Sequence, residues 1–180
     1  MSNNIQVVIL CEDNQHFHFA RKYLEHMGVN RRKIHSKTAP LGQGSGAQYV
    51  IDNYANELQV HRSKNYQKNI ALVVLLDEDT LGVKNRLDAL ENAVKNANLQ
   101  PRQKDEKVAL FVPVRNIETW LYYAETQQPV DDKEDYKKHI SITPGEAAKK
   151  LAEDICPNGL PNNAPSSLHD ACLELKRLKL

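Results

Sequence analysis

The segment ALVVLLDEDTLGVKNRL, residues 71–87, begins as an aliphatic run and then breaks abruptly into acidic residues. A short apolar run of this kind is typical of a strand that is covered on both faces of a parallel sheet. The run ends in Asp77, Glu78 and Asp79, and carboxylates this close together repel each other. Solvent, a basic neighbour or a metal ion must offset that repulsion. The segment therefore predicts a buried strand with a charged site at its carboxyl end.

Further apolar runs alternate with segments of helical periodicity along roughly the first two-thirds of the chain. The pattern predicts strands over residues 5–11, 33–36, 70–76 and 108–112, and helices over residues 17–27, 47–58, 82–97 and 117–124. Regular alternation of strand and helix implies an α/β fold. We expect a central, mainly parallel sheet of about four strands, flanked by helices on both faces.

The remainder of the chain is less regular. We expect residues 127–180 to form a helical extension that packs on the same domain as the core, residues 1–126. Thr143, Pro144 and Glu146 have the pattern of a capping box with proline at the first helical position, which opens a helix to about residue 154. Ser167 is predicted to cap the last helix.

Composition restricts the class of protein. The 24 Lys and Arg residues nearly balance the 23 Asp and Glu residues, for a formal net charge of +1, so any basic surface must be local. The N-terminal residues lack the features of a secretory signal, and no apolar run is long enough to span a membrane. The 3 cysteines are far apart and form no CxxC, which argues against a disulfide framework or a structural zinc site. We expect a soluble cytoplasmic protein without a membrane partner.

Polar residues follow each of the predicted strands. In a parallel sheet with helices on both faces, functional groups gather at the carboxyl ends of the strands. The groups that would meet there are Glu12 after the first strand, the glycine-rich loop after the second, Asp77 and Asp79 after the third, and Arg115 and Glu118 after the fourth. Four separate chain segments would thus deliver polar groups to one edge of the sheet, which predicts a functional site at that edge.

Part of this set resembles a known signature. Glu12 just after the first strand, together with Asp77-x-Asp79-x-x-Gly82-x-x-x-Arg86 after a later one, is similar to the Toprim domain of primases, topoisomerases and metal-dependent nucleases. The resemblance covers roughly the first two-thirds of the chain and implies a Toprim-like three-layer sandwich.

The glycine-rich loop and the segment RNIETWL, residues 115–121, look most like the Toprim nucleases of phage-defence systems, including the overcoming-lysogenization-defect family. One departure from the family is Asp13, which stands after Glu12 where the family usually has glycine.

The chemistry of the acidic residues can also be argued without the family. Mg²⁺ is a hard ion that binds oxygen ligands and keeps several waters, so it needs only a few carboxylates. Glu12, Asp77 and Asp79 are candidate ligands for Mg²⁺ or Mn²⁺, and with Glu118 added two metals could bind. Glu12 is either a ligand or a general base. The alternative is that Asp77 to Asp79 form a polar loop, with Asp79 or Thr80 as a helix N-cap.

Basic residues near the acidic ones could neutralise charge on a phosphate. The candidates are Lys84, Arg86 and Arg115. Farther away, Arg31, Arg32 and Lys33 form a basic patch that could track a nucleic-acid backbone. A solvated helix face and turn is the alternative for that patch.

The loop between residues 42 and 46 precedes a predicted helix. Backbone N–H groups of Gly42, Gly44, Ser45 and Gly46 could cradle a phosphate there. The loop matches neither a P-loop nor a dinucleotide fingerprint, and a flexible strand-to-helix connection is the alternative. His16 and His18 could supply a general base, but residues two apart on a helix point in different directions, which argues against a shared metal.

Two functions of different classes follow from these features. The first is a Mg²⁺- or Mn²⁺-dependent nuclease that cuts DNA or RNA phosphodiesters, as an effector in antiviral defence. The second is a non-catalytic Toprim-like binding or regulatory subunit that works with a partner ATPase, since no Walker motif occurs in the sequence. Either protein could act as a homo-oligomer.

Overall fold

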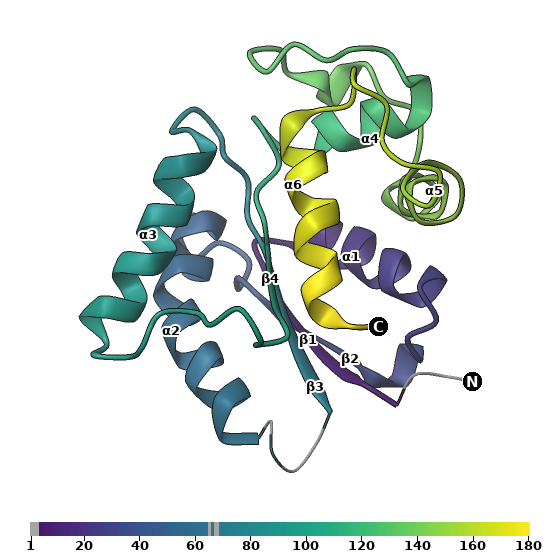
Figure 1. The fold of residues 1–180 in the computed structure, drawn as a ribbon. Coiled ribbons are helices and arrows are strands. Elements are labelled where there is room, and N and C mark those ends of the chain that lie inside the picture. The colour runs from purple at the N-terminus through teal and green to yellow at the C-terminus, as the bar shows by residue number, and fades with distance from the viewer. Residues whose placement is uncertain (1–3, 65, 67–68) are drawn as a thin grey trace.

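The computed structural model describes residues 4–64, 66 and 69–180, and a parallel sheet forms its centre (Figure 1). Within these residues the strands are β1 (Gln6–Cys11), β2 (Ile34–Thr38), β3 (Ile70–Leu75) and β4 (Val108–Phe111). They lie in the order β2-β1-β3-β4, and each neighbouring pair is parallel. Because β2 and β3 lie on opposite sides of β1, the direction in which the chain crosses the sheet reverses beside β1.

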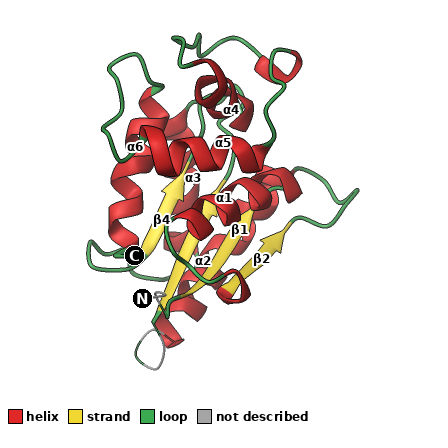
Figure 2. Cartoon of the chain, turned by 90° about the vertical axis from the view of Figure 1, so that its right-hand side faces the viewer, coloured by secondary structure: helices red, strands yellow, loops and turns green. Residues whose placement is uncertain are grey.

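Helices cover both faces of the sheet, as Figures 1 and 2 show. The α-helices of the described residues are α1 (Asn14–His26), α2 (Gly46–Lys64), α3 (Val83–Asn96), α4 (Ile117–Thr126), α5 (Pro144–Lys150) and α6 (Ser166–Leu175). Short 3-10 turns span Arg31–Lys33, Tyr136–Lys138 and Lys176–Leu178, and a π-helical turn spans Leu151–Ile155. The prediction of a three-layer α/β sandwich around a parallel sheet is confirmed.

Alternation of side chains along the strands divides the hydrophobic core into two layers. Val7 and Ile9 of β1 pack with side chains of α1, α4, α5 and α6 on one face of the sheet. Leu10 packs with side chains of α2 and α3 on the other face. All residues of β3 are buried, as expected of a central strand with a helical layer on each side. The unbroken apolar run of the sequence has this physical cause.

The C-terminal helices contain one confirmed and one wrong prediction. The capping box is present, since the Thr143 side chain accepts a bond from the Glu146 N–H and the Glu146 carboxylate accepts one from the Thr143 N–H. Ser167 does not cap α6. It lies inside the helix, and its buried Oγ accepts hydrogen bonds from Val114 N at 3.1 Å and Trp120 Nε1 at 2.9 Å. Ser167 therefore ties α6 to the segment that follows β4.

Membrane insertion through a helix has no support in the described part of the chain. None of the helices there combines the length and the apolar character that a bilayer span requires.

Candidate active site

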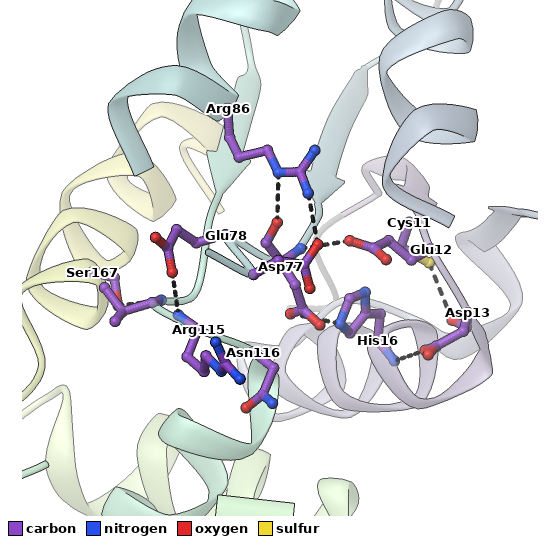
Figure 3. A network of polar contacts seen from close by, with 12 residues as sticks. Cys11, Glu12, Asp13, His16, Asp77, Glu78, Arg86, Arg115, Asn116 and Ser167 are labelled. Atoms are coloured by element: carbon purple, nitrogen blue, oxygen red, sulfur yellow. Dashed lines mark hydrogen bonds and ion pairs between the residues drawn. The ribbon is translucent and has the colours of Figure 1, made fainter. Parts of the chain in front are cut away.

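The reversal beside β1 brings two acidic residues together at the carboxyl edge of the sheet. Glu12 directly follows β1, and Asp77 comes two residues after the end of β3. Cys11 and Leu75, the last residues of these strands, are partners in the sheet. Glu12 Oε1 accepts a hydrogen bond from Asp77 N at 2.6 Å (Figure 3). In open parallel sheets, ligands bind in the crevice at such a reversal. The structure thus joins two of the predicted site residues at a favourable position.

His16 reaches the same place from the first turn of α1. Asp13 is the N-cap of α1 and accepts a hydrogen bond from His16 N at 2.9 Å. The His16 side chain is 1% exposed, and its Nε2 lies 3.0 Å from Asp77 Oδ1. The other ring nitrogen, Nδ1, is buried and has no hydrogen-bond partner in the described part of the chain. In the sequence, His16 stands out only as half of an H-x-H pair with His18, and its position three residues after the N-cap Asp13 is the signal that indicates its place.

Two neighbours of His16 have separate roles. Asp13 stands where Toprim proteins usually have glycine, but its φ of −152° is an extended conformation that any residue adopts. Glycine is therefore not needed at this turn. His18 faces a different element, since its Nε2 would lie 3.0 Å from a Cβ placed on Gly145 in α5. His18 and His16 do not act as a pair.

Asp79 is paired with Arg86 in α3, and its charge also contributes to the raised pKa of Glu12. Its backbone has a φ of 58°, in the left-handed region, and its Oδ2 lies 2.6 Å from Arg86 Nη2. The buried guanidinium of Arg86 also donates from Nε to the carbonyl oxygen of Asp77 at 3.0 Å (Figure 3). Arg86 thus holds the acidic turn in shape. The charge that was predicted to neutralise a phosphate is already paired with Asp79.

Glu78, which was not a candidate, links the turn after β3 to the segment after β4. Its Oε2 accepts a hydrogen bond from Arg115 N at 2.8 Å, and its Oε1 accepts one from Gly82 N at 2.7 Å. Glu78 N also donates to Pro113 O. Arg115 has a φ of 61°, and its guanidinium makes none of the hydrogen bonds or ion pairs found in the described residues. The backbone of Arg115 is therefore tied to the acidic turn, and its charge helps to lower the pKa of Asp135.

The cluster alters the protonation of two of its members. Burial raises the pKa of Glu12 to about 7, and the negative charge of Asp77 adds to this effect, although the hydrogen bond from Asp77 N opposes it. Burial disfavours the charged form of His16, but the hydrogen bond to Asp77 and its charge outweigh burial, and the pKa of His16 is raised. The protonated form of Glu12 is thus favoured near neutral pH, and a cation bound beside the carboxylate would favour the ionised form.

The predicted phosphate loop lies against Glu12. A hollow of about 440 Å³ opens between residues 12–14 and the loop of residues 38–46. A Cβ on Gly46 would lie 2.8 Å from the Cβ of Glu12 and 2.9 Å from its Oε2, so only glycine leaves room for this carboxylate. Gly42 and Gly44 have φ values of 76° and 73°, and Ser45 Oγ accepts a bond from the first turn of α2. The N-terminus of α2 therefore opens toward the hollow.

Glu12 and Asp77 are better placed to hold a hard divalent cation than the four predicted ligands Glu12, Asp77, Asp79 and Glu118 are together. Mg²⁺ is commonly held by one or two carboxylates and keeps several waters. The pKa of Glu12 stays raised although the nearby His16 opposes the shift, so ionised Glu12 is incompletely neutralised, whereas Asp79 is already paired with Arg86. No group of at least three His, Cys, Asp or Glu side chains in the described residues is placed to hold a metal ion. Asp79 would have to leave Arg86 before it could become a third ligand.

Within the described ranges, the remaining predicted residues make no hydrogen bond or ion pair with Glu12, Asp77 or His16. Glu118 is 6% exposed in the first turn of α4, and no hydrogen bond or ion pair within the described ranges involves its carboxylate. Lys84 is exposed on α3 and pairs with Asp88. Residues 31–33 directly precede β2, so they lie at the amino edge of the sheet, opposite the carboxylates. The structure does not bring these residues to the hollow.

Comparison with known proteins adds no family to this description. No family model matches the chain, and no curated protein or solved structure is significantly similar to it. The resemblance to Toprim proteins stays a prediction from the sequence, and the function must be argued from the geometry and charge of the site.

Proposed function

We propose that this protein is a nuclease that hydrolyses phosphodiester bonds of DNA or RNA and depends on Mg²⁺ or Mn²⁺. One observation carries the proposal. The Glu12 carboxylate accepts a hydrogen bond from the backbone N–H of Asp77 at the strand reversal, burial and the charge of Asp77 raise the pKa of Glu12, and the glycine-rich hollow opens beside Glu12. An acidic pair of this kind favours a cation, and a bound cation would attract a phosphate.

The residues of the site would divide the work. A divalent ion held by Glu12 and Asp77 would orient a water and offset the charge that develops on the phosphate. His16 holds the Asp77 carboxylate in place, and Arg86 holds the turn through Asp79 and the Asp77 carbonyl. Backbone N–H groups at the start of α2 would bind phosphate oxygens in the hollow.

Electrostatics link the cation site at Glu12 and Asp77 to the phosphate site in the hollow. Glu12 and Asp13 line the hollow together with the glycine-rich loop, so a phosphate would be repelled there without a cation. Arg115, whose guanidinium is unpaired within the described ranges, is the basic group that would assist the reaction from the β4 side. We therefore expect phosphate binding in the hollow to require the divalent ion.

The residues that resemble the Toprim signature support the same reaction. They extend the proposal to membership of that family, to a role as an effector in antiviral defence and to a location in the cytoplasm. The alternative, a non-catalytic regulatory subunit that works with a partner ATPase, is favoured by one observation. Asp79 is already paired with Arg86, and Glu12 already accepts a backbone hydrogen bond. Both carboxylates therefore have partners within the protein and do not require a metal ion.

A cleavage assay separates the two proposals. The protein is incubated with end-labelled single- and double-stranded DNA and RNA, in Mg²⁺, in Mn²⁺ and in EDTA. We expect cleavage in metal only, loss of cleavage in Asp77→Asn, and full activity in Asp88→Ala, which removes an exposed carboxylate from α3. Cleavage by Asp77→Asn at the wild-type rate would refute the assigned site. No cleavage of any substrate with either metal would favour the regulatory alternative.

A further inference from the structure

Two cysteines that are distant in the sequence lie together on the side of the sheet that α1 and α6 cover. Cys156 directly follows the π-helical turn after α5, and Cys172 lies in α6, 16 residues later. Their Sγ atoms are 3.1 Å apart, and both thiols are free and partly exposed. This pair is not part of the candidate active site, and the spacing of the cysteines in the sequence did not indicate it.

The surroundings of the pair favour reaction at Cys156. The hydrogen bond with Cys172 lowers the pKa of Cys156, burial opposes this, and a side-chain hydrogen bond with Tyr23 of α1 lowers it further. Cys156 and Cys172 are both among the residues that line a small apolar cavity of about 30 Å³ between α1, α6 and the sheet. A cavity of this size has room for a molecule about as large as water. Cys11 differs in each respect, since it is fully buried in β1 and burial raises its pKa to about 12.

We propose that Cys156 and Cys172 form a dithiol that reacts with hydrogen peroxide and closes into an intramolecular disulfide. The Cys156 thiolate attacks one peroxide oxygen, the O–O bond breaks, and the departing hydroxide takes up a proton to become water. Cys156 is then a sulfenic acid. Cys172 gives up its proton and attacks the Cys156 sulfur, the S–O bond breaks, and a second water leaves. Two thiols are oxidised by two electrons, and one peroxide is reduced to two waters.

The disulfide would fix α6 to the turn that follows α5. Helix α6 already holds the segment after β4, through the bonds that Ser167 accepts from Val114 and Trp120. Closing a loop of this length restricts the unfolded chain, so we expect the oxidised form to melt about 5–10 °C higher than the reduced form. This inference does not depend on the proposed nuclease activity.

Peptide mapping of the full-length protein tests the proposal. The protein is treated with a small molar excess of hydrogen peroxide and then unfolded, the remaining thiols are alkylated, and one sample is digested with trypsin. No Lys or Arg occurs between residues 150 and 176, so residues 151–176 form one peptide with both cysteines, which should lose the mass of two hydrogen atoms. A second sample is digested before aspartates. This cuts at Asp154 and Asp170 and separates the cysteines into two peptides, which should stay linked until they are reduced.

The variants and the third thiol provide the controls. In the wild type, Cys11 should still be alkylated after peroxide treatment. Its oxidation should be at least about tenfold slower than that of Cys156. Cys172→Ser should leave Cys156 without its partner, so that Cys156 proceeds to sulfinic acid and no linked peptides appear. The proposal is overturned if peroxide oxidises Cys11 as fast as Cys156, if the linked peptides come from two chains, or if all three thiols survive treatment.

Discussion

Removing the charge of Glu12 should abolish a pH dependence of folding stability that the site creates. The pKa of Glu12 rises from 4.5 to about 7 on folding, so the folded chain holds this proton more tightly than the unfolded chain does. Stability must then fall as pH rises through this range, because the folded state loses a proton that it binds well. Each tenfold change in proton affinity corresponds to about 1.4 kcal/mol.

The expected size follows from these values. Ionised Glu12 should destabilise the folded state by about 2–3 kcal/mol at pH 8 relative to pH 4.5, after allowance for the solvent that reaches its carboxylate. Glu12→Gln keeps an oxygen that can accept the hydrogen bond from Asp77 N but cannot ionise. The variant should therefore lack this loss. Titrating groups that do not interact with Glu12 should contribute equally in both proteins, and His16, whose pKa the charge of Glu12 helps to raise, adds to the measured difference.

Urea denaturation in EDTA, at pH 4.5 to 8, measures this difference directly. The free energy of unfolding of the wild type, minus that of Glu12→Gln, should fall by about 2–3 kcal/mol over the range. Addition of Mg²⁺ or Mn²⁺ should remove most of the fall, because a bound cation favours the ionised carboxylate. Parallel curves for the two proteins in EDTA would show that Glu12 has an ordinary pKa, and the electrostatic argument for the site would then be wrong.

Two further substitutions test the neighbours of the acidic pair. Gly46→Ala should displace the Glu12 carboxylate and cost about 1–3 kcal/mol of stability from overpacking, and it should weaken metal binding in a calorimetric titration. Gly44→Ala, which strains a positive φ but meets no atom within 4 Å, should leave metal binding unchanged, and equal weakening in both variants would argue against the contact with Glu12. His16→Ala should weaken metal binding about 10- to 100-fold, because it removes the group that orients Asp77, whereas His18→Ala should have no effect.

The main features of the sheet edge follow from local patterns in the sequence. An unbroken apolar run such as residues 70–76 must be buried on both sides, and parallel strands bring their carboxyl ends to one edge. Those two facts were enough to predict that Glu12 and Asp77 lie together. The first and last residues of the strands differ from the predicted ones by a residue or two. For example, β2 spans Ile34–Thr38, where a strand over residues 33–36 was expected.

The contacts within the site depend on backbone turns that residue types alone do not determine. Asp79 adopts a left-handed conformation and turns to Arg86, whereas an extended conformation would have aimed it elsewhere. His16 approaches Asp77 because Asp13 begins α1 at one particular residue. Lys84 shares a helix with Arg86, but two residues of separation place it on an exposed face. In each case the contact depends on where the side chain points. The number of residues between a side chain and the end of a strand does not determine this.

Binding of Mn²⁺ by the purified protein tests the central claim that Glu12 and Asp77 hold a divalent cation. Electron paramagnetic resonance measures free Mn²⁺ as protein is added at neutral pH. The account predicts that the wild type binds one Mn²⁺ ion per chain, that Asp77→Asn and Glu12→Gln lose this binding, and that Asp88→Ala keeps it. Unchanged free Mn²⁺ in the presence of excess wild-type protein, or equal binding by wild type and Asp77→Asn, would contradict the claim.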